Sequence, residues 1–289
     1  AYNENRGGII HCNIDNNTFN SMIKTDYNIN LDCKTFITQL LPNIKYNKRT
    51  KWLNEINIWK NEAGFTYEPD DNIIYSQDVL IELNKLIISM KKIQQKDYMF
   101  TTGVGNHQMF AAQFINFDKP NTLITSGSMG VMGFGLPAAI GVAVGNPNKD
   151  IINIDGDGSF LMTLSDLKTA KQYDLKNLKI LILNNKTLGM VDIWEKLFYD
   201  NRITATDNSH CPDFYKVSES FGIKNLVCNK KMDLNKILYE FLNTEGPILA
   251  EIQVKHTPCY PLVAPGKSLD EMILWNTKNI TIDKTLPPS

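Results

Sequence analysis

The chain has 289 residues, and its 30 Lys or Arg residues nearly balance its 31 Asp or Glu residues, which gives a formal net charge of −1. This balance argues against a nucleic-acid-binding protein held mainly by phosphate contacts, because such proteins carry a basic excess. No run of about 18 consecutive apolar residues occurs, so the sequence predicts no membrane-spanning helix.

The first 75 residues predict a small structured part followed by a linker. In residues 1–45 we expect a strand ending near Asp15, a short strand over residues 27–31 and a helix over residues 33–41. A strand so close to the first residue predicts that the chain belongs to a longer polypeptide. Residues 46–75 are expected to form the linker. Residues 46–60 are polar and then helical, and residues 62–72, with Gly64, Pro69 and two adjacent Asp residues, are the best linker candidate.

Residues 76–289 show the alternation of helices and strands that is typical of an α/β fold. After a helix over residues 76–90, six strands are predicted, at residues 99–101, 122–125, 151–154, 178–183, 225–227 and 248–252. Helices are predicted at residues 107–117, 137–144, 165–173, 212–221 and 234–243. Because the strands are nearly continuous apolar runs, we expect a parallel sheet flanked by helices on both faces. Ligands of such sheets bind beyond the carboxyl ends of the strands.

The first two loops after predicted strands are rich in glycine. Gly103 and Gly105 come just before the start of a helix at Asn106 and His107, where exposed backbone N–H groups favour a phosphate. An ordinary strand-to-helix turn would explain the same residues. The second loop, residues 126–137, has small residues that let the backbone approach a flat ligand.

The second loop also contains a rival pattern. Gly133, Gly135 and Ala138 match the G-x-G-x-x-A sequence of dinucleotide-binding folds, and Asp155 lies 22 residues after Gly133, where an acid could bind a ribose. That pattern requires a strand to run directly into its first glycine, whereas residues 126–132 intervene here. A dinucleotide site is therefore the less favoured interpretation.

Polar residues follow two predicted strands at the third and fourth loops. Asp157 lies in a Gly-Asp-Gly sequence, and Asn185 follows the next strand, 28 residues further on. This separation is about one strand–helix–strand unit, so the two loops can lie side by side. A carboxylate, an amide oxygen and a backbone carbonyl would form an oxygen site that suits Mg²⁺ and phosphate oxygens. A tight turn would explain Gly-Asp-Gly alone.

Together, the loop sequences resemble acetolactate synthase (acetohydroxyacid synthase) large catalytic subunits, a family that depends on thiamine diphosphate (ThDP). The sequences that carry the resemblance are GVGNHQM (103–109), MGFGLPAAIG (132–141), GDGSFLM (156–162), LGMVDIW (188–194) and PLVAPGKSLDEM (261–272). The resemblance implies a ThDP- and Mg²⁺-binding, pyrophosphate-type domain with a C-terminal tail over residues 76–289. Residues 1–45 would be the remnant of a Rossmann-like, FAD-associated middle domain, and residues 46–75 the linker.

The resemblance also implies which residues bind the metal and the cofactor. Asp157 and Asn185 would bind Mg²⁺ through their side chains, and Thr187 through its carbonyl. The other residues implied to contact ThDP are Val104, Gly105, Asn106, His107, Gly130, Met132, Gly156, Gly158, Ser159, Leu188, Gly189 and Met190.

Three larger side chains are implied to take part in catalysis. Met132 would hold ThDP in its bent form, and Met190 and Trp194 would line the substrate pocket, the tryptophan favouring the second keto acid. For any one of these residues alone, core packing is an adequate explanation. FAD, where the full-length protein retains it, would contact Asn13 and Asp32.

The implied reaction is a carboligation in branched-chain amino-acid (valine and isoleucine) biosynthesis. A hydroxyethyl unit derived from pyruvate is joined to pyruvate or 2-ketobutyrate, giving 2-acetolactate or 2-aceto-2-hydroxybutyrate. The family's activating glutamate belongs to an N-terminal domain that no part of this chain matches, so we expect the isolated chain to be an incomplete enzyme. The alternatives are another ThDP-dependent 2-keto acid decarboxylase or oxidase, or a non-catalytic ThDP-fold subunit.

Partners and compartment follow from the resemblance and from the cysteines. The family implies a homodimer or tetramer and allows a regulatory subunit, with no nucleic-acid or membrane partner. The five cysteines contain no CxxC pair and are odd in number, which argues against a disulfide framework and a zinc site. We therefore expect a reducing intracellular location, without distinguishing cytoplasm, plastid and mitochondrion.

Overall fold

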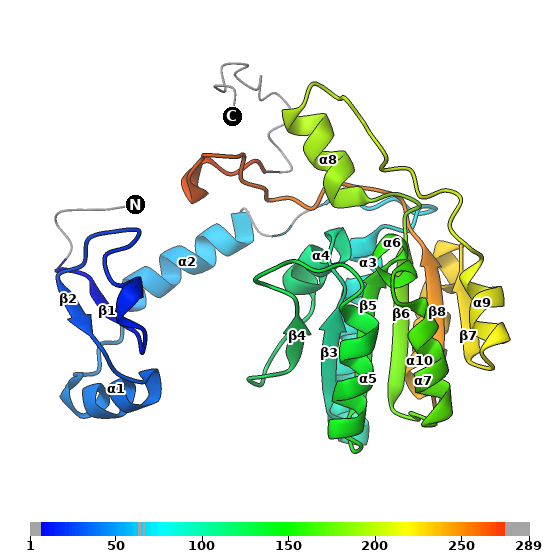
Figure 1. Ribbon diagram of the computed structural model, residues 1–289, viewed down its shortest axis with the longest axis horizontal. Coiled ribbons are helices and arrows are strands. Elements are labelled where there is room, and N and C mark those ends of the chain that lie inside the picture. The colour runs from blue at the N-terminus through cyan, green and yellow to red at the C-terminus, as the bar shows by residue number, and fades with distance from the viewer. Residues whose placement is uncertain (1–6, 63–64, 66, 275–289) are drawn as a thin grey trace. The chain divides into compact units, whose positions relative to one another are not determined.

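The computed structural model describes residues 7–62, 65 and 67–274 of the chain (Figure 1). The chain divides into two compact units, residues 1–64 and 65–289. The division falls inside the segment of residues 46–75 that was predicted as a linker. The helix predicted in the first half of that segment is α2, which spans Thr50–Glu62.

In the part that the structure describes, the first unit contains a two-stranded parallel sheet and two α-helices. Strand β1 (Ile10–Cys12) pairs with β2 (Tyr27–Ile29), and α1 (Cys33–Leu40) follows directly. Asp32 fixes the start of α1, since its carboxylate accepts hydrogen bonds from the backbone N–H groups of the first turn. The two strands are shorter than the sequence predicted.

The second unit is built on a six-stranded, wholly parallel sheet with the order β4-β3-β5-β6-β8-β7. The strands are β3 (Tyr98–Thr102), β4 (Leu123–Thr125), β5 (Asp150–Gly156), β6 (Leu178–Asn184), β7 (Lys224–Cys228) and β8 (Ile248–Gln253). All six coincide with predicted strands to within two residues at each end. The prediction of a parallel sheet flanked by helices is confirmed.

Helices cover both faces of this sheet (Figure 1). On one face, α3 (Ser76–Gln94), α4 (Asn106–Phe114) and α10 (Leu234–Asn243) enclose one hydrophobic cluster. On the other, α5 (Gly135–Gly145), α7 (Leu167–Gln172) and α9 (Phe214–Ser220) enclose a second. Successive residues of β5 alternate between the clusters, since Ile151 belongs to the second and Ile152 to the first. A strand buried on both faces must be apolar throughout, which explains the continuous runs in the sequence.

Two helices were not predicted from the sequence. The short α6 (Asp157–Leu161) starts inside the Gly-Asp-Gly segment, and α8 (Gly189–Phe198) starts inside the fourth loop. Both begin at the carboxyl edge of the sheet, so the third and fourth loops are shorter than expected. Among helices in the described part of the chain, none has the length and apolar character needed to cross a membrane.

Candidate active site

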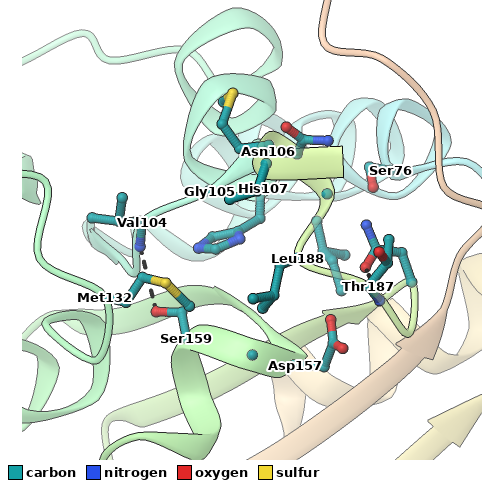
Figure 2. A pocket seen from close by; sticks show the side chains of 17 residues that line it. Ser76, Val104, Gly105, Asn106, His107, Met132, Asp157, Ser159, Thr187 and Leu188 are labelled. Carbon is teal, nitrogen blue, oxygen red and sulfur yellow. Dashed lines mark hydrogen bonds between the residues drawn. The ribbon is translucent and has the colours of Figure 1, made fainter. Parts of the chain in front are cut away.

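A cleft opens at the carboxyl edge of β3, β5 and β6 (Figure 2). The space within it is about 490 Å³ when open solvent is counted. Its lining residues are Ser76, Val104, Gly105, Asn106, His107, Met132, Gly156, Asp157, Gly158, Ser159, Leu183, Asn185, Thr187, Leu188, Gly189, Met190 and Val191. The cleft therefore joins the first, third and fourth predicted loops with Met132 of the second.

The Asp157 carboxylate is a buried acid on the wall of this cleft. Its residue is 2% exposed, and its Oδ2 accepts a hydrogen bond of 2.6 Å from Nδ2 of Asn208. Burial raises the pKa of Asp157 to about 6, against the opposing effect of that hydrogen bond. No Lys or Arg in the described residues forms an ion pair with it. A cation in the cleft would stabilise the ionised form.

Asn185 and Thr187 lie in the cleft beside the same acid. Because β5 and β6 pair in parallel with Gly156 opposite Leu183, the residues that follow these strands emerge side by side. Oδ1 of Asn185 accepts the backbone N–H of Thr187 at 3.1 Å, and the Thr187 hydroxyl donates to the carbonyl of Thr206 at 2.9 Å. These bonds hold the turn that presents both residues to the cleft.

The donor set at this point is made of oxygens. Among the described residues, no group of three His, Cys, Asp or Glu side chains could hold a metal ion. A metal here would therefore be bound by one carboxylate together with amide and carbonyl oxygens. Such a set suits a hard cation such as Mg²⁺ rather than zinc.

The Ser159 hydroxyl ties three loops together beneath the cleft. Its Oγ accepts the backbone N–H of Gly133 at 3.0 Å and that of Val104 at 3.4 Å, the second bond being dashed in Figure 2. Ser159 itself lies in α6, and its side chain also bonds Asp155. The floor of the site is thus a shared hydrogen-bond network and not three independent turns.

Asp155 is the buried centre of that network. Its side chain is fully buried. The carboxylate accepts a hydrogen bond of 3.3 Å from the side-chain amide of Asn153 and one of 3.1 Å from the backbone N–H of Gly156. Burial raises the pKa of Asp155 to about 7, against these hydrogen bonds. Gly103 and Gly135 pack directly on the carboxylate, since a Cβ on either would lie within 2.6 Å of an Asp155 oxygen. Gly103 therefore faces this acid and is not part of the cleft lining.

His107 lies against the same acid and forms part of the cleft wall (Figure 2). Its Nε2 is 3.4 Å from Oδ1 of Asp155, and this buried nitrogen has no hydrogen-bond partner among the described residues. Burial lowers the pKa of His107 to about 4, so the ring is neutral near pH 7.

Neighbouring side chains pack closely on two glycines of the cleft lining. A Cβ on Gly158 would lie 2.4 Å from Cδ2 of Leu188 and 3.6 Å from the methyl carbon of Met132. A Cβ on Gly156 would lie 2.6 Å from Nδ1 of His107. Only glycine fits at these two positions without a shift of these side chains, so backbone borders the cleft at the end of β5 and the start of α6, and N–H groups at such a place favour an anion.

Comparison with known proteins identifies the family. Residues 103–252 match the family described as thiamine pyrophosphate enzyme, C-terminal TPP binding domain. The chain belongs to the thiamine pyrophosphate enzyme family. The matched region begins at the first glycine loop and ends in β8, so it contains every residue that lines the cleft except Ser76.

Relatives from fungi, algae and bacteria extend the similarity beyond that domain. The mitochondrial acetolactate synthase catalytic subunit of Saccharomyces cerevisiae is 41% identical over 274 residues, which cover 93% of this chain and 39% of the yeast protein. The mitochondrial acetolactate synthase of Schizosaccharomyces pombe is 42% identical, over 94% of this chain and 40% of its own length. The isozyme 2 large subunit of Escherichia coli is 34% identical, over 92% and 46%. The chain thus spans about two fifths of the length of these relatives.

Not every residue that the sequence singled out for this family lines the cleft. Gly130 borders a separate hollow beside β4. Trp194 is half-buried in α8, where its ring contacts that of Phe198 edge to face at 4.8 Å, and it is not among the lining residues. Asn13 and Asp32 belong to the first unit of the chain, where the Asp32 carboxylate caps α1. The remaining predicted metal and ThDP residues come together in the cleft.

Several residues of the site were missed by sequence reasoning. Ser76, Leu183 and Val191 line the cleft. Asn208 binds Asp157 from 51 residues away, and His256 lies 3.3 Å from Asn185 although 71 residues separate them in sequence. Only the three-dimensional structure reveals such pairs, because no local pattern marks them.

The dinucleotide interpretation finds no support in the structure. Strand β4 ends at Thr125, and residues 126–134 separate it from α5, so no strand runs into Gly133. Asp155, which would have to bind a ribose, is fully buried and engaged with Asn153. Family membership and geometry agree against this alternative.

Two observations support a fit of the cleft to a diphosphate with its divalent cation. Asp157 is a buried acid without a cationic partner among the described residues. Gly156 and Gly158 line the cleft and carry no side chains of their own, so backbone borders the cleft there. Each of these features is stabilised by a charged, hydrogen-bonding ligand.

Proposed function

We propose that this chain is the ThDP-binding portion of an acetolactate synthase catalytic subunit. Identity of 34–42% to proteins of that name over more than nine tenths of the chain supports the assignment. The observation that carries it is the cleft itself, in which a buried acid and an amide from neighbouring strands border a glycine floor at the carboxyl edge of the sheet.

In this proposal Asp157 and Asn185 bind Mg²⁺ through side-chain oxygens, and Thr187 contributes its carbonyl. Burial of Asp157 without a cationic partner among the described residues supports this role. The diphosphate lies along Gly156 and Gly158. The other residues proposed to border ThDP are Val104, Gly105, Asn106, His107, Gly130, Met132, Ser159, Leu188, Gly189 and Met190.

The chemistry divides between the cofactor and the protein. ThDP, when bound, supplies the nucleophilic carbon and the electron sink that decarboxylation of a 2-keto acid requires. The protein orients the cofactor and excludes water. Met132 supports the bent cofactor, and its position next to Gly158 is consistent with that role. Met190 and Trp194 set the shape of the substrate pocket, with the tryptophan selecting the second keto acid.

The wider assembly is proposed by analogy with the relatives. Pyruvate would be the first substrate, and pyruvate or 2-ketobutyrate the second. The full-length protein would form a homodimer or a tetramer, with a regulatory subunit as a further partner, in a reducing intracellular compartment. Residues 1–45 would belong to the FAD-associated middle domain, with Asn13 and Asp32 facing FAD, and residues 76–289 would form the catalytic domain.

The test combines cofactor binding with product analysis of the full-length protein. Calorimetry should detect Mg²⁺-dependent ThDP binding in the wild type, and Asp157→Ala and Asn185→Ala should each weaken it at least tenfold, because each removes a direct metal ligand. Asp166→Ala, at a half-buried residue outside the cleft lining, serves as the matched carboxylate control and should bind as the wild type does. ThDP binding that is independent of Mg²⁺ and of Asp157 would refute the site.

Product analysis then separates the proposed reaction from its alternatives. Incubation with pyruvate should give 2-acetolactate, and addition of 2-ketobutyrate should give 2-aceto-2-hydroxybutyrate. Acetaldehyde or acetate as the main product would instead identify a decarboxylase or an oxidase. Tight ThDP binding without turnover of pyruvate would favour a non-catalytic subunit.

A further inference from the structure

The side-chain amide of Asn185 is linked by hydrogen bonds to a histidine and, through it, to an aspartate. Nδ2 of Asn185 lies 3.3 Å from Nδ1 of His256, and Nε2 of the same ring lies 2.6 Å from Oδ2 of Asp192. The three residues come from separate elements, since Asn185 follows β6, Asp192 is in the first turn of α8 and His256 follows β8. The contacts therefore link three segments at one side of the cleft.

The direction of these hydrogen bonds is fixed by the atoms involved. Oδ1 of Asn185 accepts the N–H of Thr187, so its Nδ2 faces His256. An amide NH₂ can only donate, so Nδ1 of His256 must accept, and the ring proton must then lie on Nε2. A carboxylate can only accept, and Asp192 is the acceptor for that proton. Asp192 thus selects one tautomer of the histidine, and that tautomer selects one orientation of the Asn185 amide.

Close packing gives this orientation little freedom. A Cβ on Gly189 would lie 2.9 Å from Nδ2 of Asn185 and 3.0 Å from Cε1 of His256. The Asp192 side chain is 6% exposed and that of His256 is 20% exposed, so water competes weakly for the bond between them. A reversed amide would place its NH₂ on the Thr187 side, where it would repel a cation.

We infer that His256 and Asp192 form a positioning pair that keeps the Asn185 amide oxygen turned away from the imidazole and available to the divalent cation. The inference rests on the proposed function, because it assumes that Asn185 binds Mg²⁺. Neither His256 nor Asp192 touches substrate or cofactor in this scheme. Residues behind a metal ligand commonly act in this way, and their loss weakens metal binding by about 10- to 100-fold.

The test uses two substitutions that each keep one half of the imidazole. In His256→Gln the new side-chain amide nitrogen can replace Nε2 and donate to Asp192, but no atom replaces Nδ1 as the acceptor of the Asn185 amide N–H. In His256→Asn the shorter side chain places its amide oxygen near the position of Nδ1, where it can accept the hydrogen bond from Asn185. The measurement is the dissociation constant of Mg²⁺ for the full-length protein at saturating ThDP, by calorimetry. We expect His256→Gln to weaken Mg²⁺ binding about tenfold or more, and His256→Asn to recover most of the affinity. His210→Gln makes the same replacement at an exposed histidine and should leave the affinity unchanged.

Two further measurements separate positioning from a structural role. At saturating Mg²⁺, ThDP affinity and the thermal unfolding temperature of His256→Gln should stay close to wild-type values. In an Asn185→Ala background, His256→Gln should cause no additional loss of Mg²⁺ affinity, because the group it positions is already absent. Asp192→Asn provides an independent variant and should weaken Mg²⁺ binding in the same direction.

The outcomes distinguish this inference from the proposed function. Wild-type Mg²⁺ affinity in both His256→Gln and Asp192→Asn would overturn the positioning pair and leave the ThDP site standing. The inference would also be overturned if His256→Gln weakened Mg²⁺ binding as much in the Asn185→Ala background as in the wild type, or if His256→Gln lowered the thermal unfolding temperature substantially. Absence of Mg²⁺-dependent ThDP binding in the wild type would overturn the proposed function and this inference together.

Discussion

Gly103→Ala and Gly158→Ala make the same change at two places around the site, and the structure predicts that the first mainly lowers stability whereas the second mainly weakens ThDP binding. At position 103 the new Cβ would lie 1.8 Å from Oδ1 of Asp155 and 2.3 Å from Oγ of Ser159. Both atoms are buried and hydrogen-bonded, so neither can move away without breaking bonds. Overpacking of a core costs about 1–3 kcal/mol. Two lost hydrogen bonds add about 1 kcal/mol each, so we expect Gly103→Ala to lower the free energy of unfolding by about 3–5 kcal/mol.

At position 158 the obstacle is flexible. The new Cβ would lie 2.4 Å from Cδ2 of Leu188, which is the far end of a side chain that can rotate away. An off-rotamer side chain costs about 0.5–1.5 kcal/mol, so the free energy of unfolding should fall by about 1 kcal/mol. The methyl group would nevertheless stand on the glycine floor of the cleft. We therefore expect Gly158→Ala to weaken ThDP binding at least tenfold while the protein remains folded.

Urea denaturation of the apo protein and calorimetry with Mg²⁺ and ThDP measure the two effects separately. Gly141→Ala is the control, because Gly141 is an exposed residue of α5 and a Cβ there meets nothing within 4 Å. That variant should bind ThDP normally and gain up to about 1 kcal/mol from helix propensity. A loss below about 1 kcal/mol for Gly103→Ala, outside the range for a core clash, would contradict the packing argument. Wild-type ThDP affinity in Gly158→Ala would contradict the location of the cofactor.

Two other predictions concern groups away from the cleft. Burial raises the pKa of Glu251, so this side chain ionises at a lower pH in the unfolded chain than in the folded one, and its contribution to stability falls as the pH rises. The difference in unfolding free energy between the wild type and Glu251→Gln (wild type minus variant) should therefore decrease from pH 4 to pH 8. An increase over this range would contradict the raised pKa. Asn177 donates its side-chain N–H groups to the carbonyls of Ala143, Asn146 and Lys149, so Asn177→Ala should lower the free energy of unfolding by about 1–3 kcal/mol. Chemical denaturation checks both, and an unchanged midpoint for Asn177→Ala would show that water replaces the lost donor.

The sheet was predictable because its strands carry a strong local signal. Residues 151–154 and 178–183 are apolar at nearly every position, as burial on both faces requires. The two helices that were not predicted differ in this respect. Helix α6 has only five residues and carries no periodic signal, so tertiary packing decides for a helix there. Helix α8 does carry one, since Met190, Ile193, Trp194 and Leu197 recur at helical spacing, but it begins at Gly189 directly after a loop and was overlooked.

The candidate site was predictable where function depends on the end of a strand and unpredictable where it depends on long-range contacts. Asp157 and Asn185 could be found together because parallel strands end at the same edge of the sheet. Asn208 and His256 could not, since the segments that carry them, before α9 and after β8, reach the site only after the chain has folded. Trp194 is outside the lining of the cleft in the described residues, so its assignment to the substrate pocket stays a prediction.

The glycines of the first loop show why a motif can be recognised correctly and interpreted incompletely. Both Gly103 and Gly105 suggest a phosphate-binding turn, yet only Gly105 borders the cleft. Gly103 is required because the buried Asp155 carboxylate leaves no room for a side chain. The same acid presses against Gly135 and takes a bond from Ser159, so one buried carboxylate explains small residues in three loops. Selection for a ligand and selection for packing then produce the same sequence pattern, and only substitutions that separate affinity from stability can assign each glycine to its cause.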